Sequence, residues 1–155
     1  MFNTTVSCDN ASINTLDEAE RAINNKDYRA LAVAASKIAA VVLENRYLVE
    51  PLHVIATRLA ETAEYIPAAV NAAKVAASYA PSGSDLERQA VSTWSKHVEA
   101  LPEPKQRIAA AKVAARYAPR GSDLARQARQ ELQRASVPNV PTSAAAQTFV
   151  KNFHL

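Results

Sequence analysis

The feature that most constrains this 155-residue chain is an internal repeat. Residues 72–90 read AAKVAASYAPSGSDLERQA, and residues 110–128 read AAKVAARYAPRGSDLARQA. The two copies lie 38 residues apart and differ at only three positions, which are Ser78/Arg116, Ser82/Arg120 and Glu87/Ala125. A repeat of this length is typical of arrays of helical hairpins, in which each unit packs on the next.

Each copy contains the sequence signals of a helix, a tight turn and a second helix. The alanine-rich run ends at a proline (position 81 or 119), which cannot continue a helix because it lacks a backbone N–H. The only two glycines of the chain, Gly83 and Gly121, follow at the same repeat position and can adopt the positive φ of a tight turn. Ser84 and Ser122 are then expected to cap the next helix, and Glu87 completes a capping box in the first copy.

These signals predict an all-α fold of antiparallel helical hairpins with about seven or eight helices. Alanine is abundant and aromatic residues make up only 6% of the chain, which favours closely packed helices. The arrangement is either a repeat array with a period of about 38 residues or a compact bundle. The expected helices cover residues 15–24, 28–45, 50–65, 67–79 and 84–100, then the run from the Pro102–Pro104 break to 117, and residues 122–135.

We expect one domain, flanked by two segments of different character. Residues 1–14 are predicted to be a flexible leader, because Thr15 and Glu18 form a capping box at the start of the first helix. Residues 15–136 form the helical repeat domain. Residues 137–155 are predicted to be a proline-punctuated linker followed by a short helix after Thr142.

The predicted last helix carries the apolar side chains of the C-terminal tail. They either cover an exposed end of the helical stack or reach a neighbouring copy and drive self-assembly. The residues of this possible assembly tail are Phe149, Val150, Phe153 and Leu155.

Charge is distributed unevenly along the chain. Residues 1–64 contain six Lys/Arg and nine Asp/Glu, whereas residues 65–155 contain twelve and six. The net charge therefore changes from −3 to +6 between the two parts. A basic half of this kind indicates an acidic protein surface or a nucleic acid as the partner, although it is also what a solvated basic face would produce.

The cations of the second half gather on a stripe. On a helical projection, Lys105, Lys112 and Arg116 fall within about 40° of one another, at 100° per residue. Arg120 extends this stripe into the following turn. The predicted partner-binding residues are Lys105, Lys112, Arg116, Arg120, Arg126 and Arg129.

No pattern of catalytic or metal-binding residues is present. The three histidines have no partner at metal-ligand spacing, so we predict no catalytic residues, no metal site, no cofactor and no enzymatic activity. His97 is expected to edge the core, because it lies at helical spacing from Trp94 and Leu101. The single cysteine excludes an intramolecular disulfide, and no apolar run is long enough to span a membrane. We therefore expect a cytoplasmic protein that does not contact a membrane.

The repeat resembles the tetratricopeptide (TPR) family of helix–turn–helix units. Asn25–Tyr28 (NKDY) resembles the turn between the two helices of that family, and Ala69, Ala76 and Pro81 match the spacing of its two small residues and closing proline. Ala19 matches a further small position and Trp94 an aromatic one. The chain departs from the family in its period of 38 rather than about 34 residues. It departs also at Val91 and Arg107, which occupy usually small positions.

The resemblance covers roughly residues 15–136 and implies a partner-binding scaffold. We therefore expect a protein-binding module, such as an adaptor, a chaperone-like factor or an inhibitor, whose basic surface contacts an acidic partner. The alternatives are a nucleic-acid-binding helical domain and a structural protein that self-assembles through its C-terminal tail, which would make it a homo-oligomer.

Overall fold

The computed structural model describes residues 10–136, with side chains placed for residues 13–134. This part of the chain is helical and contains no strand, which confirms the predicted all-α class. Two short 3-10 turns, Arg46–Leu48 and Ala63–Tyr65, flank one of the α-helices. The α-helices are α1 (Asn10–Asn24), α2 (Tyr28–Val41), α3 (Val49–Leu59), α4 (Ile66–Tyr79), α5 (Asp85–Glu99), α6 (Pro104–Tyr117) and α7 (Asp123–Ser136).

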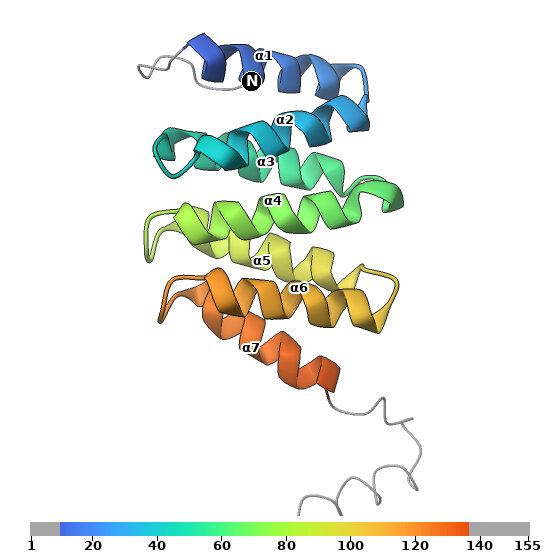
Figure 1. The fold of residues 1–155 in the computed structure, drawn as a ribbon, viewed down its shortest axis with the longest axis vertical. Helices are drawn as coiled ribbons and strands as arrows, with labels where there is room; N and C mark the ends of the chain where they lie inside the picture. The colour runs from blue at the N-terminus through green and yellow to red at the C-terminus, as the bar shows by residue number, and fades with distance from the viewer. Residues whose placement is uncertain (1–9, 137–155) are drawn as a thin grey trace, which may run out of the picture.

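The helices form a stack of two layers, with α1 at one end and α7 at the other (Figure 1). α2, α4 and α6 make one layer, and α1, α3, α5 and α7 make the second. Most packing is between helices that are neighbours in the chain, such as α3 with α4, α4 with α5, and α6 with α7. Each hairpin therefore buries its apolar face against the hairpins beside it, which is the organisation of a repeat array.

The 38-residue period extends beyond the two copies that the sequence reveals. α2, α4 and α6 each contain 14 residues, and they begin at Tyr28, Ile66 and Pro104, at intervals of 38 residues. The α2 copy escapes detection in the sequence because larger residues occupy its core. For example, Leu31 and Ile38 lie where α4 has Ala69 and Ala76.

Three helix boundaries differ from those expected by more than one residue. α1 begins at Asn10 rather than Thr15, so residues 10–14 of the predicted leader are helical; Ile13 and Leu16 share a face, which continues the apolar spacing upstream. α2 ends at Val41, where the Asn45 side-chain amide donates to the Val41 carbonyl at 3.0 Å. α3 ends at Leu59, because the backbone becomes extended at Thr62. Residues 1–9 and 137–155 lie outside the described residues, and the predicted C-terminal helix lies there with them.

The two turns of the repeat form as predicted. Gly83 and Gly121 both have a φ of +78°, a conformation that costs an L-residue about 1–2 kcal/mol. Ser84 Oγ accepts from the Glu87 N–H at 3.1 Å, and Ser122 Oγ accepts from the Ala125 N–H at 3.2 Å. The Glu87 carboxylate accepts from the Gly83 N–H at 2.9 Å, one residue further back than a capping box requires.

The core combines small residues from α4 and α6 with larger ones from α2 and from the opposite layer. Ala73, Ala76, Ala111 and Ala114 are fully buried, and Trp94 of α5 is the largest fully buried side chain. Alanine at these positions lets the helix axes approach closely, which is why the layers pack without many aromatic residues. Within the described residues, none of the helices combines the length and the apolar character that crossing a membrane requires.

Two histidines lie in or beside this core. His97 of α5 is buried, as predicted from its spacing, and His53 of α3 is half-buried with its Nε2 2.9 Å from Thr93 Oγ1. Burial lowers the pKa of His53, against a smaller opposing effect of Glu50. Burial also lowers the pKa of His97, and the positive charges of Lys96 and His53 lower it further. Both imidazoles therefore bind a proton less readily in the folded protein than in the unfolded chain.

This arrangement predicts that the fold loses stability in mild acid. Both pKa values are lower in the folded chain than in the unfolded chain, so below about pH 6.5 the unfolded chain binds more protons. The contribution of these two histidines to the free energy of unfolding should be fully present above that pH. It should decrease as the pH falls through and below that value. Urea unfolding at pH 7.5 and pH 5 measures this change. The double variant His53→Asn/His97→Gln should show a smaller loss, and an equal loss would assign the effect to other groups.

Candidate protein-binding surface

The predicted stripe of cations lies on one side of α6. Lys105, Lys112 and Arg116 are all exposed, and they occupy successive turns because they are seven and four residues apart. At a rise of about 1.5 Å per residue, the stripe is about 16 Å long. Arg120 is exposed in the turn that follows α6. The structure therefore places four of the six predicted residues on α6 and its turn.

This stripe borders the open edge of the α2–α4–α6 layer. A groove of about 230 Å³ between α4 and α6 is lined by Pro67, Val70, Leu101, Gln106, Ala109 and Ala110, which identifies the side of α6 that faces α4. At 100° per residue, Ile108, Lys112 and Ala115 lie on roughly the opposite side of α6. That side faces away from α4, and no further helix of the described chain follows α6 in this layer.

The cations of the stripe have no acidic partners among the described residues. No ion pair joins a carboxylate of residues 13–134 to any of the four cations, which are Lys105, Lys112, Arg116 and Arg120. The one contact of Arg116 is with the neighbouring Tyr117, whose ring centroid lies 5.7 Å from the guanidinium carbon. Tyr117 itself is 67% exposed, so this pair remains open to a binding partner.

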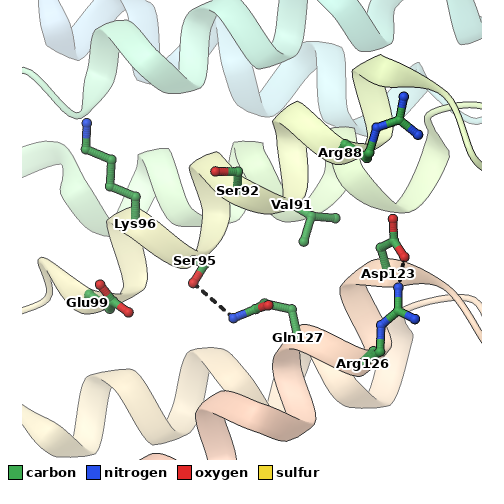
Figure 2. A pocket seen from close by; sticks show the side chains of 9 residues that line it. All are labelled: Arg88, Val91, Ser92, Ser95, Lys96, Glu99, Asp123, Arg126 and Gln127. Carbon is green, nitrogen blue, oxygen red and sulfur yellow. Dashed lines mark hydrogen bonds and ion pairs between the residues drawn. The ribbon is translucent and has the colours of Figure 1, made fainter.

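The two predicted residues on α7 lie outside this group because they are on a different helix. Arg126 forms an ion pair with Asp123 of its own helix and lines a groove between α5 and α7 (Figure 2). Arg129 is exposed on α7 and makes no ion pair with the described residues. We therefore restrict the candidate surface to α6 and its turn, and define the cationic edge as Lys105, Ile108, Lys112, Ala115, Arg116 and Arg120.

Sequence reasoning did not find the groove between α5 and α7. Its volume is about 450 Å³, and its charges gather toward the two ends: Arg88, Asp123 and Arg126 lie at one end, Lys96 and Glu99 toward the other (Figure 2). Val91, Ser92, Ser95 and Gln127 line the middle. One signal was available, since the repeated DLxRQA places an Asp–Arg pair in each copy, and both pairs form.

A buried carboxylate joins α5 to α7 beside this groove. The Glu131 side chain is 6% exposed, and its Oε1 accepts from Ser95 Oγ at 3.1 Å, Gln127 Nε2 at 3.4 Å and Arg134 at 3.3 Å. Gln127 also donates to Ser95 Oγ at 3.2 Å, so these groups form one network. Because its acceptors and donors are matched within the fold, we interpret this network as a structural link between the two helices.

The remaining predicted residues carry no structural description. Phe149, Val150, Phe153 and Leu155 lie outside the described residues. Within residues 13–134, no three or more His, Cys, Asp or Glu side chains gather in a way that would hold a metal ion. No protein-family model matches the chain, and comparisons with curated proteins and with solved structures found no significant match.

The Glu131 network yields a stability prediction. The variant Glu131→Ala removes the carboxylate that accepts from the half-buried Ser95 and Gln127 side chains, so it should lower the free energy of unfolding by about 1–3 kcal/mol. Glu99→Ala is the matched control, because Glu99 contacts the same Arg134 at 2.6 Å from an exposed position and should cost less than about 1 kcal/mol. Urea denaturation monitored by circular dichroism compares the two, and equal losses would contradict a structural role for the network.

Proposed function

We propose that the protein is a non-enzymatic protein-binding module whose cationic edge contacts an acidic surface of another protein. The observation that carries this proposal is that four exposed cations lie together on α6 and its turn without a carboxylate partner among the described residues. An adaptor, a chaperone-like factor or an inhibitor would each use such a surface.

Only some of the exposed cations among the described residues are paired with a carboxylate. Arg58, Arg88 and Arg126 each pair with a carboxylate three residues away in the sequence. Such exposed pairs contribute about 0–1 kcal/mol, so the fold gains little from them and loses little where they are missing. The unpaired cations on α6 are therefore available to attract an acidic partner and to accelerate its association.

The differences between the two repeat copies support it as well. In a stretch that is otherwise nearly identical, Arg116 and Arg120 replace Ser78 and Ser82 of the first copy. Both arginines fall on the cationic edge, next to the exposed Tyr117. Arg and Tyr are enriched at the energetically important positions of protein interfaces. The resemblance to TPR repeats, which implies a partner-binding scaffold, points to the same class of function.

A charge-reversal experiment tests this proposal. The variant Lys112→Glu/Arg116→Glu/Arg120→Glu changes three exposed side chains, so it should keep the helical content and the unfolding midpoint of the wild-type chain. The amount of partner protein that it captures from an extract of the source cells should fall about tenfold or more, since each reversed charge turns attraction into repulsion. Quantitative affinity capture with immobilised protein measures this loss.

The matched control is Arg21→Glu/Lys26→Glu/Arg29→Glu, which reverses three exposed cations at the opposite end of the stack. It should retain the captured partners. Equal loss in both variants would contradict a specific surface, and retention in the α6 variant would reject the cationic edge. Labelled RNA and DNA oligomers test the alternative partner class: binding that collapses with salt and vanishes in the α6 variant would assign the edge to nucleic acid instead.

A further inference from the structure

One edge of α4 is equivalent to the cationic edge of α6, and in this molecule α6 itself packs against that edge of α4. α4 and α6 are equivalent helices of the repeat, and α6 packs along the edge of α4 that corresponds to the cationic edge. On that edge of α4, Val70 and Ala77 are buried at 7% and 1% exposure. Their equivalents on α6, Ile108 and Ala115, are only half-buried. The edge of α4 is therefore one example of this surface covered by a helix; on α2 the equivalent Ala32 and Ala39 stay half-buried, although α4 packs against that helix.

A lysine that both repeat copies contain shows the same difference in burial between α4 and α6. Lys74 on α4 and Lys112 on α6 occupy the same position in the identical stretch AAKVAA. Lys74 is half-buried and its pKa is lowered by that burial, whereas Lys112 is exposed. The two positions differ in that α6 lies against α4, while no described helix lies against this side of α6. The edge of α6 therefore has the small and apolar residues of a helix-packing surface, and none of the described helices covers it.

The charge of the edge indicates that a helix binding there would differ from the helices of this array. Two edge positions that are uncharged on α4, Pro67 and Ser78, are Lys105 and Arg116 on α6. A second copy that offered its own α6 edge would bring the same cations together and be repelled. Residues 137–155 of this chain contain no Asp or Glu and add Lys151, so they do not complement the edge either.

From this charge and shape we propose that the cationic edge binds an acidic amphipathic helix of the partner protein, which lies beside α6 as the next helix of the layer. The inference rests on the proposed function and specifies the form of the partner. The apolar face of the partner helix packs on Ile108 and Ala115, where the small alanine permits an interaxial distance of about 8–10 Å. Its carboxylates lie opposite Lys105, Lys112 and Arg116. A helix as long as α6 would extend about 21 Å along the edge.

The test uses the full chain and a synthetic peptide of about 18 residues, long enough to form a helix in water. One face of the peptide carries alanine and leucine, and three glutamates follow the spacing of Lys105, Lys112 and Arg116. A second peptide has glutamine in place of these glutamates, and a third copies residues 142–155. Fluorescence anisotropy measures affinity, and amide chemical shifts of the isotope-labelled chain locate the site.

The expected result is binding of the acidic peptide with shifts concentrated at Ile108, Lys112 and Ala115. The glutamine peptide should bind more weakly. The protein variant Arg116→Ser/Arg120→Ser should bind the acidic peptide about 3- to 10-fold more weakly, because it removes two cations. This variant restores the residues of the first copy, so the fold accommodates it.

Three results would overturn the inference. No binding of the acidic peptide up to about 1 mM would do so, and so would shifts confined to other helices. Binding of the 142–155 peptide at the same edge, in competition with the acidic peptide, would assign the edge to the chain's own C-terminal segment. The charge-reversal capture experiment separates the two proposals: if capture depends on the edge but the acidic helix does not bind it, only the helical form of the partner is wrong. If both fail, the proposed function is wrong as well.

Discussion

The fold depends on the close packing of small residues between stacked helical hairpins. Ala73, Ala76, Ala111 and Ala114 are buried to completion, and this packing is possible only because a neighbouring hairpin lies against each one. A single hairpin has no partner for its second face, so the units stabilise one another in sequence. The same rule leaves an exposed edge where a layer ends. Among the described residues of the α2–α4–α6 layer, α2 has one such edge and α6 has the other, which coincides with the unpaired cations.

Much of the local structure could be predicted because its causes are local. The prolines at 81 and 119, the glycines that follow them and the serine caps act within a few residues, and the turns form where the sequence places them. The misplaced boundaries have weaker sequence signals. α2 ends at Val41, whose carbonyl accepts from the Asn45 amide, and α1 begins upstream of Thr15, where Ile13 and Leu16 share a face; neither signal outweighs a capping box in a sequence pattern.

The candidate site could be predicted only in part, because burial depends on what lies beside a helix. A helical projection groups Lys105, Lys112 and Arg116, but it shows no neighbours. Lys74 and Lys112 demonstrate the limit, since identical local sequences place one lysine half-buried between helices and the other in solvent. The groove between α5 and α7 and the Glu131 network required the same information, because Ser95 and Glu131 meet only after the two hairpins stack.

The chemistry of the α6 edge also bears on how the array ends. An edge equipped to pack a helix invites association between copies, much as an unpaired strand does in a sheet. Charge is one means of preventing it: Lys105, Lys112 and Arg116 lie beside the apolar Ile108 and Ala115, so two such edges would repel each other. The same cations attract a helix of opposite charge. One substitution pattern, serine to arginine between two nearly identical repeats, thus disfavours extension by a like edge while permitting a complementary partner.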